Sequence, residues 1–181
     1  PGLTATSVAS LAIGLGGTLA IFAVAYGVLF RPLPFADPDR LLQVRTLVQR
    51  DQLEPRAFSV PDLRDYRAGT TSVFTDMAAL SSFTMTVRAT GVGVPTSSAM
   101  VGATYFSLLG VSPLVGSVWP ERDDADDTPP ILISEGLWER HFNRDPQVVG
   151  RTLYGDDQAF IVSGVMPAAF RGTSGTVEAW V

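Results

Sequence analysis

The sequence predicts an α/β (α+β) domain attached to a single membrane-spanning helix. Residues 1–30 contain no Asp, Glu, Lys, Arg or His. Residues 8–30 would span roughly 35 Å as a helix, enough to cross a hydrocarbon core about 30 Å thick. After Arg31, charged residues are interspersed and short apolar groups alternate with turn residues, which is typical of a folded domain of about 150 residues.

The apolar segment carries small residues at helical spacing, because Ser10, Gly14 and Thr18 fall four apart. Small residues at this spacing let two helices approach closely in lipid, although Gly and Ser are also frequent in membrane spans generally. A cleaved signal peptide is the alternative, since residues 23–25 match a small-x-small cleavage pattern. Against cleavage, no basic region precedes the apolar stretch. One flank does not fix the orientation of the span.

Composition removes several classes of function. The formal net charge is -5 and the isoelectric point is about 4.7, which argues against binding to nucleic acid. All 13 basic residues are arginine, so the sequence offers no Schiff-base lysine and no phosphate-binding P-loop lysine. Cysteine is absent, which excludes disulfides, thiolate nucleophiles and thiolate metal sites within these residues.

Local patterns predict the elements of the first half of the domain. In chain order they are a stiff, extended, proline-rich connector (31–40), a strand (41–48), a loop (49–56), a helix capped by Ser59, a hairpin (83–89 and 96–102) and a short helix (104–109) ending at Gly110. In the helix after Ser59, Leu63 and Tyr66 are expected to face the core. Phe74, further along the chain, is expected to face the core as well.

A second group of elements begins near Pro113. An apolar run (131–133) leads to Ser134, which is expected to cap a helix that ends at Phe142. Leu137 and Trp138 lie on one face of that helix with Phe142. A hairpin follows (151–154 and 159–165), turning at residues 155–157.

Candidate catalytic residues are few. His141 is the one histidine in the sequence, and with Ser134 and Asp145 it suggests a hydrolase triad. Positions 134 and 141 are two turns apart on one helix, roughly 10 Å along its axis. We therefore expect a solvated helix histidine and no catalytic residue.

An acidic loop resembles part of a calcium site. It contains Asp123, Asp124, Asp126 and Asp127, and Glu135 falls at the twelfth position counted from Asp124. Proline occupies the position where such a loop needs glycine, so a solvated loop is favoured and no metal site is assigned.

Other motifs have structural explanations. The glycine groups near residues 14–17, 91–93 and 172–175 lack the strand-turn-helix setting of a dinucleotide fingerprint and are expected in turns or helix contacts. Trp119, Trp138 and Trp180 are expected to pack in the core or at an interface rather than to line a ligand surface.

Four motifs in order carry a resemblance to a known family. They are residues 20–22 leading to 31–34 (Arg-Pro-Leu-Pro), 106–116 (Phe-x-x-Leu-Gly-Val-x-Pro-x-x-Gly), 134–142 (Ser-x-Gly-Leu-Trp-x-Arg-x-Phe) and 162–167 (Val-x-Gly-Val-Met-Pro). Together they resemble the MacB/FtsX-like ABC transporter permease family, especially the large duplicated permeases of soil bacteria.

The resemblance implies a fold and a division of the chain. A first transmembrane helix (1–30) precedes a two-lobed extracytoplasmic domain, with a porter-like lobe (31–112), a second small α/β lobe (113–170) and a return to the first lobe (171–181). The core domain of the family continues past residue 181. The chain is thus expected to be part of a longer permease and to show an unpaired sheet edge.

The resemblance also implies a function. The chain would be a non-enzymatic element of an inner-membrane permease, with its domain on the periplasmic side, no cofactor, and motion driven by a partner ABC ATPase. The remaining permease helices and a second permease copy are the other expected partners. The alternative from the residues is a membrane-anchored or secreted module that binds a peptide or another ligand.

Overall fold

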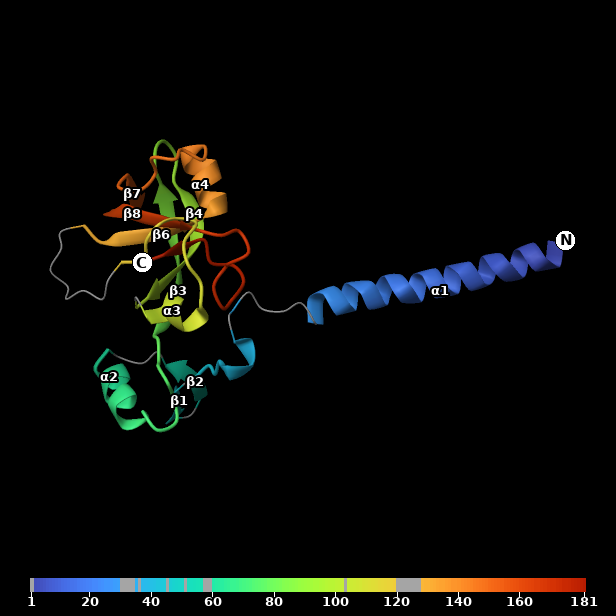
Figure 1. Cartoon of the computed structure of the whole chain (residues 1–181), viewed down its shortest axis with the longest axis horizontal. Helices are drawn as coiled ribbons and strands as arrows, with labels where there is room; N and C mark the ends of the chain where they lie inside the picture. Colours follow the sequence, from blue (N-terminus) through green and yellow to red (C-terminus); the bar gives the residue numbers. More distant parts are fainter. Residues whose placement is uncertain are drawn as a thin grey trace. The chain divides into compact units, whose positions relative to one another are not determined.

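The computed structural model describes residues 2–29, 35, 37–44, 46–50, 52–56, 60–102, 104–119 and 128–181, with the backbone alone for 27–29, 46–50, 52–56 and 60. The chain divides into two compact units, Pro1–Pro34 and Phe35–Val181. The first contains one helix and the second contains the α/β domain (Figure 1).

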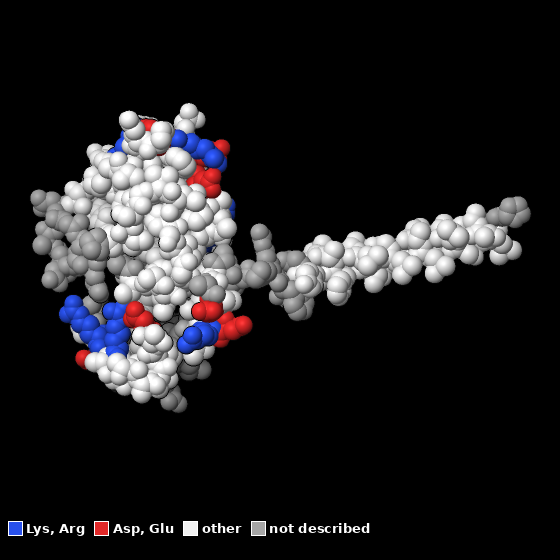
Figure 2. All heavy atoms as spheres, in the orientation of Figure 1, with Lys and Arg blue, Asp and Glu red and all other residues white. Residues whose placement is uncertain are grey.

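Helix α1 (Gly2–Leu29) confirms that the apolar segment is helical. Its stretch Gly2–Tyr26 is long and apolar enough to cross a membrane. The hydroxyl of Thr18 donates to the Gly14 carbonyl at 2.8 Å, so this polar group is satisfied within the helix. Figure 2 shows a helix without charged side chains.

The connector differs from its prediction where the structure describes it. Residues Pro38–Arg40 form a 3₁₀ turn, η1, in place of an extended segment. Proline suits the first position of a helical turn because its fixed φ matches and its missing N–H is not needed there. Residues 31–34 and Ala36 lie outside the described residues.

The segment after the connector also corrects the sequence prediction. The expected strand covers residues 41–48, but Leu41–Val44 are not in a strand. The strands here are β1 (Thr46–Arg50) and β2 (Gln52–Arg56). They form an antiparallel hairpin in which Thr46 pairs with Arg56. The expected loop (49–56) is therefore mostly strand. Backbone pairing makes these polar residues extended, and apolar alternation does not reveal such pairing.

Helix α2 (Val60–Gly69) begins where the sequence predicts, although its expected cap, Ser59, lies outside the described residues. Leu63 and Phe74 are half-buried, but Tyr66 is 48% exposed, so its predicted core position is wrong. The side chain of Arg67 donates from Nη2 to Thr104 Oγ1 at 2.7 Å and thereby links α2 to the start of the next helix.

The remaining strands form one seven-stranded mixed sheet that closes on itself (Figure 1). The strands are β3 (Leu80–Arg88), β4 (Val94–Val101), β5 (Val115–Gly116), β6 (Pro130–Ser134), β7 (Thr152–Gly155), β8 (Gln158–Met166) and β9 (Ala179–Trp180). Their order is β5-β8-β6-β9-β4-β3-β7, and β7 pairs again with β8. Both predicted hairpins, β3–β4 and β7–β8, are confirmed.

Both predicted short helices are confirmed, with the predicted terminal residues. Helix α3 (Thr104–Leu109) ends at Gly110, whose φ of 67° is the left-handed conformation that glycine adopts without strain. Helix α4 (Glu135–Phe142) begins at Ser134, whose Oγ accepts a hydrogen bond from the Leu137 N–H at 3.1 Å.

Two apolar clusters fill the domain. Cluster 1 lies between α4 and the sheet, and its fully buried members include Val87, Ile133 and Leu137. Cluster 2 is aromatic and includes Phe106, Phe170 and Trp180. The β3–β4 hairpin contributes side chains to both clusters. Met85 and Val87 belong to cluster 1, and Ala99 and Val101 belong to cluster 2.

The proposed boundary between lobes near residue 113 stays a prediction. In the structure, β3 and β4 precede that residue and share one sheet with β6 and β8, which follow it. Strand β3 has an outer edge that pairs with β7 only at Val87 and Arg88, so an unpaired sheet edge is present among the described residues.

Candidate functional site

The connector docks on the aromatic cluster of the domain. Phe35 is half-buried, and its ring meets that of Phe170 edge-on, with centroids 6.3 Å apart and planes at 71°. Leu41, just after the 3₁₀ turn, packs against the same cluster. Two apolar side chains on either side of η1 therefore hold the start of the domain against cluster 2.

From Phe170 the ring contacts continue into the centre of the sheet. Phe170 stacks on Trp180 with centroids 5.2 Å apart, and Phe106 of α3 lies 6.4 Å from Trp180. Trp180 belongs to β9, which pairs with both β4 and β6. Residues that are far apart in sequence thus form one continuous path of packed rings from the connector to the sheet.

Trp180 also carries a buried polar atom. Its side chain is fully buried, and its Nε1 has no hydrogen-bond partner among the described residues. Most buried indole N–H groups are paired. Phe170 stacks on this ring and Phe106 meets it edge-on, and these contacts keep it in place despite the unpaired donor.

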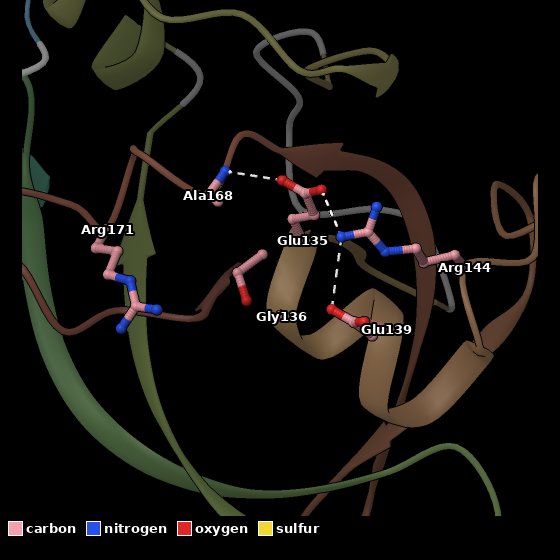
Figure 3. A pocket seen from close by; sticks show the side chains of 7 residues that line it. Glu135, Gly136, Glu139, Arg144, Ala168 and Arg171 are labelled. Carbon is pink, nitrogen blue, oxygen red and sulfur yellow. Dashed lines mark hydrogen bonds and ion pairs between the residues drawn. The ribbon is translucent and has the colours of Figure 1, made fainter.

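A shallow pocket of about 250 Å³ lies beside the start of α4 (Figure 3). Its acidic lining is already neutralised: Arg144 Nη2 lies 2.9 Å from Glu135 Oε1 and 3.5 Å from Glu139 Oε2. Glu135 Oε2 also accepts the Ala168 N–H at 3.3 Å. Arg171 extends into the pocket from the opposite side.

This pocket is small and open compared with typical ligand cavities of roughly 300–1,000 Å³. Its ion pairs join Arg144, which follows the C-terminus of α4, to Glu135 and Glu139 on that helix, and Arg144 and Glu139 are largely exposed to solvent. It gives little support to the alternative of a ligand-binding module.

The three triad candidates are engaged separately. The Ser134 hydroxyl accepts the capping bond of α4, and the Asp145 carboxylate pairs with Arg151 and accepts the Gln147 N–H. Partial burial and the neighbouring Arg140 charge lower the pKa of His141, which Glu178 partly offsets. Among the described residues, no hydrogen bond joins Ser134, His141 and Asp145 to one another, so the structure does not assemble a triad.

The remaining candidates are the acidic loop, the tryptophans and the glycine groups, and those that the structure describes are packing or turn residues. Asp123, Asp124, Asp126 and Asp127 lie outside the described residues. Among the tryptophans, Trp138 donates from Nε1 to the Asp145 carbonyl at 2.9 Å, and Trp119 packs on Phe106 with centroids 5.7 Å apart, which confirms that they are packing residues. Gly91, Gly172 and Gly175 have positive φ in turns.

Sequence reasoning did not identify Phe35 and Phe170 as a contact. The available signal was a single aromatic residue within a proline-rich polar connector, Arg-Pro-Leu-Pro-Phe-Ala-Asp-Pro. Periodicity could not reveal its partner, because the two rings are separated by most of the chain.

The motif residues that suggested a family serve the fold. Among the described motif residues, several are buried, cap a helix or sit in a tight backbone contact, as Phe106, Ser134 and Gly164 do. Residues 4–181 match the family model of the MacB-like periplasmic core domain. The chain belongs to this family.

One solved structure shows the same fold, and two others are similar over part of the chain. The extracellular domain of the noncanonic ABC-type transporter YknZ from Gram-positive bacteria matches with a TM-score of 0.56 and 18% identity, over 69% of this chain and 62% of that one. The periplasmic region of MacB from Actinobacillus actinomycetemcomitans gives a TM-score of 0.48 and 15% identity, covering 64% and 61%.

A putative permease domain from Porphyromonas gingivalis gives a TM-score of 0.40 and 19% identity, covering 59% and 49%. The chain spans less than two thirds of each of these three domains. No curated protein matches the sequence. The family model establishes a MacB-like periplasmic core domain, and the YknZ comparison supports its fold.

Proposed function

We propose that this chain is the first membrane helix and the extracytoplasmic core of an ABC-type permease, and that it relays motion without catalysing a reaction. A partner ABC ATPase would drive the remaining permease helices, and the substrate would be exported. The domain would lie on the periplasmic side of the inner membrane, anchored by α1.

The docked connector is the observation that supports a relay. A helix can move a domain only if the segment between them is fixed to that domain, and Phe35 and Leu41 provide two such points on cluster 2. Protein cores are close-packed and resist compression, so a displacement at Phe35 passes through Phe170 to Trp180 and the sheet.

Membrane location and sidedness are tested with the full chain. Because the sequence contains no cysteine, Ser174→Cys in an exposed loop provides a unique label. We expect the chain to remain in carbonate-washed membranes, and a membrane-impermeant maleimide to label Ser174→Cys once the outer membrane is permeabilised while the inner membrane stays intact. Release by carbonate, or labelling only after the inner membrane is disrupted, would contradict the proposal.

The relay itself is tested in the complete permease with its ATPase in nanodiscs. A fluorophore on Ser174→Cys, with any other cysteines replaced, should change its signal when ATP is added. Phe35→Ala should abolish most of that change while ATP hydrolysis continues. Leu42→Ala is the matched control, since Leu42 is 75% exposed. An unchanged ATP response in Phe35→Ala would contradict the relay.

A further inference from the structure

The ring of Trp180 lies where the path of packed rings meets the sheet. It stacks on Phe170, with centroids 5.2 Å apart and planes at 28°, and it meets Phe106 edge-on, with centroids 6.4 Å apart and planes at 73°. Phe170 in turn contacts Phe35 of the connector. A displacement of the connector therefore reaches the indole ring through one intermediate side chain.

The backbone of Trp180 joins two parts of the sheet. Strand β9 is two residues long and lies between β4 and β6, with Trp180 opposite Ala99 on one side and opposite Leu132 on the other. Strand β4 forms a hairpin with β3, and β6 pairs on its other side with β8. A shift of Trp180 is thus transmitted to both parts of the sheet at once.

The indole N–H of Trp180 is buried without an acceptor. The side chain is fully buried, and its Nε1 has no hydrogen-bond partner among the described residues. The residues around the ring already exclude solvent, so a further segment of a longer protein cannot reach this atom without displacing them. An unpaired buried donor raises the free energy of the state that contains it.

The other buried polar groups do not provide a partner for this N–H. Within cluster 2, the hydroxyl oxygen of Tyr105 accepts the Thr173 N–H at 3.3 Å. The remaining buried polar side chains among the described residues, Thr96, Ser98 and Ser134, each hydrogen-bond to the backbone. A buried water needs about two to four polar partners, so this apolar cluster does not suit one.

We propose that Trp180 is the switching residue of the relay: its N–H is unpaired in this structure and gains an acceptor when the connector is displaced. This inference rests on the proposed function. A displacement favours a second state only if the two states differ in interaction free energy, and the pairing of a buried donor supplies such a difference. The unpaired N–H destabilises the present state, and its pairing stabilises the displaced one.

An isostere tests the N–H alone. In benzothienylalanine a sulfur atom replaces the indole N–H on a ring of nearly the same shape, so the packing against Phe170 and Phe106 is kept while the donor is removed. An amber codon introduces it at Trp180 of the full chain. The same replacement at Trp138, whose Nε1 donates to the Asp145 carbonyl at 2.9 Å, is the matched control.

The first measurement is urea unfolding of the full chain in detergent, followed by the fluorescence of the two remaining tryptophans. The isostere at Trp180 should raise the midpoint by an amount equivalent to an about tenfold larger folding constant, because the unpaired donor is gone. The isostere at Trp138 should lower the midpoint, because a formed hydrogen bond is lost. A lower or unchanged midpoint at Trp180 would show that its N–H carries no penalty in this state, and would overturn the inference.

The second measurement is the ATP-driven signal of a fluorophore on Ser174→Cys in the complete permease, with ATP hydrolysis recorded in each sample. The isostere at Trp180 should remove most of that signal, because the displaced state no longer gains a hydrogen bond. The isostere at Trp138, which packs against cluster 1 and lies outside the path of rings, should keep the signal.

The two proposals fail in different ways. If the unmodified permease responds to ATP and the isostere at Trp180 responds equally, this inference is overturned and the relay stands. If the unmodified permease gives no response while ATP is hydrolysed, the relay itself fails, and the switching role of Trp180 fails with it.

Discussion

Gly116 and Gly164 lie opposite each other in the β5–β8 pair, and neither has room for a side chain. A Cβ on Gly116 would lie 2.1 Å from the Ser163 carbonyl oxygen, and a Cβ on Gly164 would lie 2.5 Å from the Val115 carbonyl oxygen. Gly116 also has a φ of 77°. Two glycines from separate motifs thus serve one purpose, the close approach of two backbones.

Gly116→Ala should destabilise the domain by about 3 kcal/mol, because it combines left-handed strain with a backbone clash. Gly150→Ala is the control: its φ is 87° but its Cβ would meet nothing within 4 Å, so it should cost about 1 kcal/mol. Urea unfolding of the full chain in detergent measures both. All three tryptophans lie after residue 35, so their fluorescence follows the domain alone. Equal losses in the two variants would contradict the clash.

Ser134→Ala should lower the free energy of unfolding by about 1 kcal/mol, because the Leu137 N–H loses its acceptor at the start of α4. Ser112→Ala, at an exposed position whose hydroxyl bonds to no described residue, should change the free energy of unfolding by less than about 0.5 kcal/mol. The same fluorescence assay compares them. A Ser134→Ala variant as stable as Ser112→Ala would show that the cap contributes nothing.

Arg67→Lys should loosen the segment between α2 and β3. Arg67 donates from Nε to the Met77 carbonyl at 2.8 Å and from Nη2 to Thr104 Oγ1 at 2.7 Å, a fork that one ammonium group cannot reproduce. We expect a loss of about 1–2 kcal/mol and faster amide exchange in residues 70–79. Arg64→Lys, at an exposed position, is the control. If amide exchange in residues 70–79 were no faster in Arg67→Lys than in Arg64→Lys, this role would be contradicted.

His141 should make the domain less stable in acid. Burial and Arg140 lower the pKa of His141 in the folded state below its ordinary value of 6.5, so protonation favours the unfolded chain. Its contribution is absent well above pH 6.5, and stability falls as the pH drops below that value toward the folded-state pKa. His141→Gln should therefore lose less stability than the wild type between pH 7.5 and pH 5. Parallel pH profiles for the two proteins would contradict this sign.

Local chemistry explains which features were predictable. Ser134 caps α4, Gly110 ends α3, and residues 155–157 turn the β7–β8 hairpin, because each depends on neighbours within a few residues. The bounds of the strand after the connector and the core position of Tyr66 were predicted wrongly. The strand depends on its partner strand, and the exposure of Tyr66 depends on how α2 packs. Neither is contained in the local sequence pattern.

The sequence by itself determined the apolar, charge-free helix, the α/β class, the caps and the family, because these follow from composition and short-range spacing. Only the tertiary structure decided that β7 closes the sheet, that the edge of β3 stays open before Thr86, and that Phe35 docks on Phe170. Each of these joins residues distant along the chain. Their free energy comes from packing and backbone pairing, which exist only once the chain has folded.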